Sequence, residues 1–134
     1  MVGVLIITHG SFAEALISTA EGIVGPIENM RSVSVSAEDD LESIKGAVSK
    51  IIKTVDQGEG VILLTDMFGG TPSNIGLSFL NNGKVDILTG VNLPIVLKLA
   101  KGRKGKTLDE LAKLVRKKGR ESIVLASEML RGKT

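Results

Sequence analysis

The chain has 134 residues, of which 43% are hydrophobic and 24% charged, and its formal net charge is +2. This length predicts one domain over residues 1–134, since domains cluster at about 100–150 residues. The absence of cysteine excludes disulfides and Cys-ligated metals, and a single histidine excludes a multi-histidine zinc site in one chain. No apolar run approaches the roughly 20 residues of a membrane span, and the N-terminus lacks a secretory pattern. We therefore expect a soluble cytoplasmic protein.

Charged and aromatic residues are unevenly distributed. Residues 98–120 contain ten Lys or Arg and two acids, so the remainder of the chain is acidic. Such a block can attract an acidic partner or phosphates, or it can be a solvated face. The only aromatics are Phe12, Phe68 and Phe79, whereas single-stranded nucleic acids usually stack on aromatic rings. We therefore expect no nucleic-acid partner.

Short apolar runs alternate with longer helical patterns along the chain. Continuous apolar runs predict strands buried on both faces, as in parallel sheets, and apolar residues at helical spacing predict the helices between them. In chain order we expect strand 2–8, helix 11–24, strand 31–35, helix 36–55, strand 61–65, helix 71–80, strand 85–89, helix 94–101 and helix 107–119. Residues 122–125 resemble a further strand.

Polar residues at the expected helix starts predict how four helices begin. Side-chain oxygens of such residues accept hydrogen bonds from the first free amides of a helix. The predicted caps are Ser11 with Glu14, Ser36, Thr71 with Pro72, and Thr107 with Glu110.

Strands that alternate with helices indicate an α/β domain with a mainly parallel sheet. In such sheets ligands bind beyond the carboxyl ends of the strands, where the strand order reverses. The loops after the first, third and fourth strands therefore matter most. They contain residues 9–10, 66–74 and 90–92.

His9 and Asp66 follow the first and third predicted strands directly. A histidine at this edge can act as a base, a nucleophile or a phosphate carrier, or it can simply hydrogen-bond a backbone group. If the first and third strands are neighbours, Asp66 can accept the Nδ1 proton of His9 and leave Nε2 as the nucleophile. Alone, Asp66 is equally consistent with a carboxylate that caps its own loop.

The segment Gly69-Gly70-Thr71-Pro72-Ser73-Asn74 is a glycine-rich turn that enters a helix. Free backbone amides at such a turn can bind an anion. The turn lacks the Gly-Lys-Ser/Thr ending of a P-loop, so nucleotide binding is not indicated. A phosphate carried on His9 would suit it, with Gly69, Gly70, Thr71 and Ser73 as the phosphate-binding residues; ordinary turn chemistry is the alternative.

Taken together, these motifs resemble the enzyme IIA domain of the mannose family of the bacterial phosphoenolpyruvate:sugar phosphotransferase system (PTS). The resemblance covers nearly the whole chain, because separate loops match in order and spacing. The matching segments are residues 6–10, 64–74, 90–94 and 119–121.

The resemblance implies a phosphoryl relay. His9 would accept a phosphoryl group at Nε2 from the phosphocarrier HPr and pass it to enzyme IIB, which serves the membrane components IIC and IID. Asp66 would hold the imidazole, and the amides around Thr71 would cradle the phosphate. The family needs no cofactor or metal for this step. Because HPr is basic, we expect the basic block 98–120 to lie away from His9.

The resemblance also implies a fold and an assembly. The family fold is a three-layer sandwich around a parallel sheet in the order 2-1-3-4. A C-terminal antiparallel strand is exchanged between two subunits of a homodimer, and this would account for the strand-like residues 122–125.

Three other functions remain open at this point. The phosphotransferase subunit of dihydroxyacetone kinase shares the fold and the strand-end histidine, although the GGTPSN turn favours the sugar-transport version. A hydrolase could combine Ser73 or Ser11 with His9 and Asp66, but neither serine lies in a Gly-x-Ser-x-Gly elbow. A non-catalytic regulatory module could dock its basic helix on an acidic partner or nucleic acid.

Overall fold

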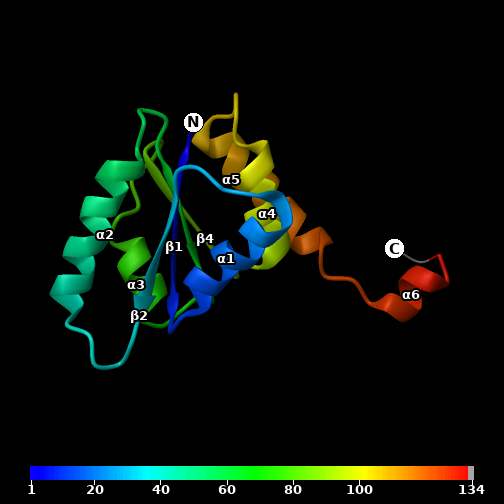
Figure 1. The fold of residues 1–134 in the computed structure, drawn as a ribbon, viewed down its shortest axis with the longest axis horizontal. Coiled ribbons are helices and arrows are strands. Elements are labelled where there is room, and N and C mark those ends of the chain that lie inside the picture. Colours follow the sequence, from blue (N-terminus) through cyan, green and yellow to red (C-terminus); the bar gives the residue numbers. More distant parts are fainter. Residues whose placement is uncertain (133–134) are drawn as a thin grey trace.

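The computed structural model describes residues 1–132 and contains a four-stranded parallel sheet between two layers of helices (Figure 1). The strand order is β2-β1-β3-β4, as the resemblance implied. The strands are β1 (Gly3–His9), β2 (Met30–Val35), β3 (Val61–Thr65) and β4 (Val85–Thr89). The helices are α1 (Phe12–Val24), α2 (Leu41–Val55), α3 (Thr71–Leu77), α4 (Leu93–Gly102), α5 (Leu108–Glu121) and α6 (Ala126–Leu130).

The central strands have two buried faces, which explains why their sequences are continuously apolar. On β1, Val4 and Ile6 pack in one core with α1, α4 and α5. Leu5 and Ile7 point the other way and pack in a second core with α2 and α3. Alternate residues of one strand therefore hold two helical layers on the sheet.

The predicted N-cap residue is correct at two of the four helix starts, and the predicted side-chain hydrogen bond forms at one of them. Thr107 and Glu110 form the expected capping box of α5. Ser11 is the N-cap of α1 but makes no side-chain hydrogen bond, because the Oγ1 of Thr8 accepts the amide of Ala13 at 2.8 Å instead. The prediction for α2 was wrong, since Asp40 rather than Ser36 caps it.

Helix α3 is shorter than the pattern predicted. It begins at Thr71, as predicted, but Gly70 rather than Thr71 is its N-cap, and it ends at Leu77 in a run of turns. Helix α5 continues two residues beyond the predicted end at Gly119.

Residues 122–125 form no strand in the single chain; they connect α5 to the short helix α6. Figure 1 shows α6 extending away from the body of the domain. Exchange of this segment between two subunits stays a prediction. Within the described residues, no helix is long and apolar enough to cross a bilayer.

Candidate functional site

The sheet register brings His9 and Asp66 together. Strands β1 and β3 are paired neighbours, with Ile7 opposite Thr65. His9 is the last residue of β1, and Asp66 follows the last residue of β3. Because parallel strands end at the same edge, both side chains lie at the carboxyl edge of the sheet, as predicted.

The carboxylate of Asp66 holds His9 by two hydrogen bonds. Its Oδ2 atom lies 2.8 Å from Nδ1 of the imidazole and also accepts the backbone amide of His9 at 3.0 Å. The other oxygen, Oδ1, accepts the amide of Met67 at 3.1 Å. With Nδ1–H donated to the carboxylate, the neutral imidazole carries its lone pair on Nε2.

The two members of the pair differ in exposure. The side chain of His9 is 50% exposed, whereas that of Asp66 is 15% exposed. Burial opposes ionisation of Asp66, but the hydrogen bonds from the His9 ring and backbone, together with the charge of the ring, outweigh it and hold the pKa of Asp66 below its ordinary value. At neutral pH the carboxylate is therefore an ionised acceptor behind an accessible ring.

Gly70 lies against the outer edge of the imidazole. A Cβ atom at this position would be 3.2 Å from Cε1 and 3.3 Å from Nε2 of His9. The backbone of Gly70 has φ +84°, a conformation that favours glycine. The glycine-rich turn therefore approaches the nitrogen that carries the free lone pair, and a side chain here would crowd it.

The predicted phosphate-binding residues lie in different surroundings. Gly70 and Thr71 are exposed, and Gly69 is partly covered. Ser73 is fully buried, and its Oγ has no hydrogen-bond partner within the described chain. Among the hydrogen bonds of the described residues, neither Ser73 nor Ser11 bonds to His9, so the serine-hydrolase arrangement is not formed.

Two threonines that support the site were not identified from the sequence. Thr8 precedes His9 and Thr65 precedes Asp66, and both are fully buried. Thr8 anchors the start of α1, as described above, and the Oγ1 of Thr65 donates to the carbonyl of Met67 at 3.3 Å. The signal available in the sequence is a threonine directly before each functional residue.

The loop after β4 reaches this edge but does not hydrogen-bond to His9. The amides of Gly90 and Val91 both donate to the carbonyl of Thr65 at 3.0 Å. Asn92 caps α4 by accepting the amide of Ile95 at 3.0 Å. This loop therefore braces the end of β3, next to Asp66.

The basic block divides into a buried part and a surface part. Arg103 is buried, and its guanidinium donates to four backbone carbonyls, those of Leu99, Val2, Asn29 and Glu28. Burial lowers the pKa of Arg103, and the charge of Glu28 opposes that shift. Arg116 and Arg120 line a hollow of about 300 Å³ with residues of the β4–α4 loop. That end of the block is therefore at the same sheet edge as His9, two strands away.

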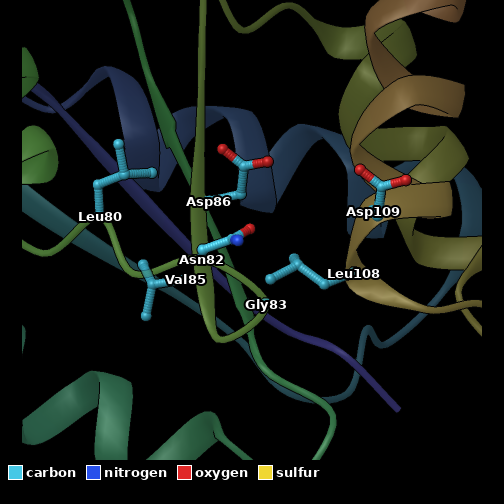
Figure 2. Close-up of a pocket in the computed structure, with 7 residues that line it drawn as sticks. All are labelled: Leu80, Asn82, Gly83, Val85, Asp86, Leu108 and Asp109. Carbon is cyan, nitrogen blue, oxygen red and sulfur yellow. The ribbon is translucent and has the colours of Figure 1, made fainter.

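A larger hollow lies at the opposite end of the sheet. It has a volume of about 460 Å³, and Figure 2 shows Asp86 of β4 and Asp109 of α5 on two of its sides. The site at His9 is instead a half-exposed side chain on an open edge. Within residues 1–132, no three His, Cys, Asp or Glu side chains are grouped to hold a metal ion.

Comparison with known proteins gives consistent matches. The family model described as "PTS system fructose IIA component" matches residues 3–116. The chain is 30% identical over 131 residues to the PTS system fructose-specific EIIA component of Bacillus subtilis, covering 97% of this chain and 90% of that protein. It is 28% identical to the mannose-specific EIIAB component of Escherichia coli, where the match covers 91% of this chain but 38% of the longer protein.

Solved structures agree with these matches over most of the chain. The EIIA component of Streptococcus agalactiae superposes with a TM-score of 0.85 at 25% identity, covering 95% of this chain and 98% of that one. A mannose/sorbose-specific IIA subunit from Enterococcus faecalis gives a TM-score of 0.83 at 25% identity, covering 92% and 93%.

Proposed function

The chain belongs to the PTS IIA components of the mannose, fructose and sorbose type, and on that premise we propose that it carries a phosphoryl group on His9. The group would come from phospho-HPr and pass to enzyme IIB during coupled sugar uptake and phosphorylation. The relatives are named for different sugars, so the proposal names no sugar. Those names favour the sugar-transport version over the dihydroxyacetone kinase subunit.

One observation carries the proposal: the 2.8 Å contact between Nδ1 of His9 and Oδ2 of Asp66. It fixes the tautomer in which the Nε2 lone pair can attack phosphorus. As the new N–P bond forms, the N–P bond of the donor phosphohistidine breaks and its electron pair returns to the donor ring. The His9 ring gains positive charge in this step, and the Asp66 carboxylate stabilises that charge.

The phosphoryl oxygens need donors around Nε2. We assign this role to the turn of Gly69, Gly70, Thr71 and Ser73, because Gly70 abuts Nε2 and the first amides of a helix have no intrahelical acceptor. The side chain of Ser73 is fully buried, so Ser73 would serve this role through its backbone amide. Donor and acceptor are both phosphohistidines, so the transfer is close to thermoneutral and needs positioning rather than a cofactor or metal.

The remaining features of the proposal follow from the family. Residues 1–134 would form one IIA domain that works in the cytoplasm, with HPr and IIB as direct partners and IIC and IID as indirect ones. Two subunits would form a homodimer by exchanging residues 122–125 as an antiparallel strand. We assign β4, one of the two edge strands of the sheet, as the acceptor of this segment.

The direct test is incubation with phosphoenolpyruvate, enzyme I and HPr, followed by intact mass measurement. We expect one added phosphoryl group, labile in acid and stable in alkali, as for a phosphoramidate. His9→Ala should fold and take up none. Label that persists in His9→Ala would contradict the assignment, and an unlabelled parent chain would contradict the proposed function as a whole.

A further inference from the structure

The basic block 98–120 has no role in the chemistry proposed for His9, yet most of its charge is at the surface. Of its ten Lys and Arg residues, only Arg103 is buried. The other nine are exposed or half-buried, and seven of these nine are lysines. A surface of this charge attracts anions, so the position of the lysines on the fold decides what kind of anion it can bind.

Lys113 and Lys117 lie on the outer side of α5. Each follows by two residues a fully buried side chain, Leu111 and Val115 respectively. Two residues correspond to about 200° around an α-helix, so both lysines are on the side of α5 that faces away from the sheet. Lys118 is exposed next to them.

Helix α4 extends this surface. Lys101 is exposed two residues after the fully buried Leu99, and Lys98 is half-buried on the same helix. The two helices are in close contact, because a Cβ atom on Gly119 of α5 would come within 2.7 Å of Cδ1 of Ile95 of α4. Figure 1 shows both helices on the side of the sheet opposite α2 and α3. We name Lys98, Lys101, Lys113, Lys117 and Lys118 the basic face.

Few acids neutralise the basic face. The block contains two, Asp109 and Glu110, and the next acid in the chain is Glu121 at the end of α5. Asp109 pairs with Lys113 at 3.0 Å, and Glu110 accepts the amide of Thr107 at 2.9 Å in the capping box. Among the ion pairs of the described residues, no other lysine of the basic face takes part. Four of its five ammonium groups therefore have no carboxylate partner within residues 1–132.

The composition of the basic face favours a diffuse layer of negative charge over one tightly held phosphate. Lysine ammonium groups act as point charges, whereas arginine is the residue that holds a phosphate by two hydrogen bonds. The three phenylalanines of the chain lie outside α4 and α5, so the basic face has no ring on which a nucleic-acid base could stack. The headgroups of acidic phospholipids form such a layer, and clusters of about four to eight Lys or Arg on a surface helix are typical of proteins that bind them.

We propose that the basic face binds the surface of a membrane that contains acidic phospholipids. Each lysine near such a surface strengthens binding about fivefold. The attachment is electrostatic and reversible, because the face presents ammonium groups rather than apolar side chains that enter the hydrocarbon. The inference goes beyond the proposed function and does not depend on chemistry at His9, although it would hold the chain near the membrane components of the proposed relay.

The path of α4 determines how the chain lies on the membrane. Asn92 caps the start of α4 at the carboxyl edge of the sheet. Arg103, directly after the end of α4, donates to the carbonyl of Val2, which precedes β1 at the opposite edge. Helix α4 therefore runs from one edge of the sheet to the other, and a membrane on its outer side is parallel to the strands. The carboxyl edge with His9 then faces sideways and stays open to a protein partner.

The first experiment measures co-sedimentation of the full chain with lipid vesicles. Vesicles of phosphatidylcholine with about one-third phosphatidylglycerol should bind the chain at low ionic strength, and vesicles of phosphatidylcholine alone should not. Binding should fall steeply as the salt concentration rises from about 0.02 M to about 0.3 M, because the Debye length shortens. Binding that needs no phosphatidylglycerol, or that is insensitive to salt, would overturn the inference.

Two triple variants of equal net charge locate the attachment. The first removes three lysines of the basic face, Lys98→Gln, Lys101→Gln and Lys117→Gln. The control removes three lysines of α2, on the other side of the sheet, Lys45→Gln, Lys50→Gln and Lys53→Gln. Each set contains one half-buried and two exposed lysines. The first variant should bind the acidic vesicles about 100-fold more weakly than the parent, and the control should stay within about threefold of the parent, because distant charges are screened. Equal losses would show that only net charge matters and would overturn the basic face as the site.

Nucleic acid is the competing polyanion. We expect the chain to bind duplex DNA and an RNA hairpin more weakly than the acidic vesicles at the same salt concentration. Tighter binding to either nucleic acid, lost in the basic-face variant and kept in the α2 variant, would assign the face to nucleic acid and overturn the membrane.

Labelling by phospho-HPr on the vesicles tests the orientation. The labelling rate of the bound chain should stay close to the rate in solution, because the carboxyl edge is left open. A rate that falls in proportion to the bound fraction would overturn this orientation. A chain that binds the vesicles but takes up no phosphate would contradict the proposed function and leave the membrane attachment intact.

Discussion

Replacement of Asp66 by Asn separates the charge of the pair from its shape. The carboxylate accepts three hydrogen bonds, two from His9 on Oδ2 and one from Met67 on Oδ1. An amide of the same shape has only one oxygen. If the single oxygen of the substituted side chain faces His9, its NH2 group faces the backbone amide of Met67, which is also a donor. If the oxygen faces Met67, the NH2 group faces two donors, the Nδ1–H and the backbone N–H of His9.

The expected losses of stability and of transfer rate follow from the donor that is left without an acceptor in either orientation. A buried donor left without an acceptor costs about 1–3 kcal/mol, so the variant should fold with reduced stability. Loss of an orienting partner slows reactions by about 10- to 100-fold at metal-bound histidines, and by about 10⁴-fold in a catalytic triad where the tautomer changes. We therefore expect Asp66→Asn to slow transfer from phospho-HPr by roughly 10²- to 10⁴-fold. Rapid-quench labelling gives the rate, and peptide mapping should still find phosphate on His9.

Asp56→Asn is the matched control, since Asp56 accepts the amides of Gly58 and Gly60 in a loop at the other edge of the sheet. It should transfer at the parental rate. A parental rate in Asp66→Asn would refute the reasoning and leave Asp66 as a loop cap. The free energy of unfolding provides a second measurement. Because the pKa of Asp66 is lowered in the folded protein, the ionised carboxylate stabilises the fold above about pH 4, and this stabilisation is lost as the pH falls through the lowered pKa. Denaturation curves of parent and variant should converge in acid.

Three further perturbations test the turn, the basic block and the C-terminal arm. Gly70→Ala places a methyl group against Nε2 and strains a backbone with positive φ, so labelling should slow at least about tenfold while the chain stays folded; a parental rate would exclude close approach of the turn. Arg103→Leu leaves buried carbonyls without donors, so urea denaturation should show a loss of about 3 kcal/mol or more, and unchanged stability would contradict a structural role. Removal of residues 122–134 should convert a dimer into monomers or aggregate, and a full-length chain that sediments as a monomer would contradict strand exchange.

The sheet and the central pair were predictable because their signals are local and strong. A strand buried on both faces needs an unbroken apolar run, and β1 and β3 provide one each. The positions of His9 and Asp66 at the ends of those strands follow from the same runs. Their contact required one further fact, that β1 and β3 are neighbours, which the family resemblance supplied and the sheet order confirms.

The helix starts were less predictable because several side chains compete for the same free amides. Thr8 lies five residues before Ala13 and outside α1, yet its hydroxyl reaches that amide because β1 ends directly below it. Ser11 then has no such role. At α2, Asp40 lies next to the first apolar residue and caps the helix, while Asp39 accepts the amide of Ser36 in the preceding turn. Tertiary position, which sequence spacing does not contain, decides between such candidates.

The exposure of the pair explains why the site is built on an edge rather than in a cavity. In the proposed relay His9 meets the histidine of a second protein and has to be reachable, and it is half exposed. Its orientation must nevertheless be fixed, and Asp66 can do this because it is mostly covered and held by Met67. An accessible ring on a covered carboxylate satisfies both needs. It also leaves the exclusion of water from His9 to the partner of the proposed relay.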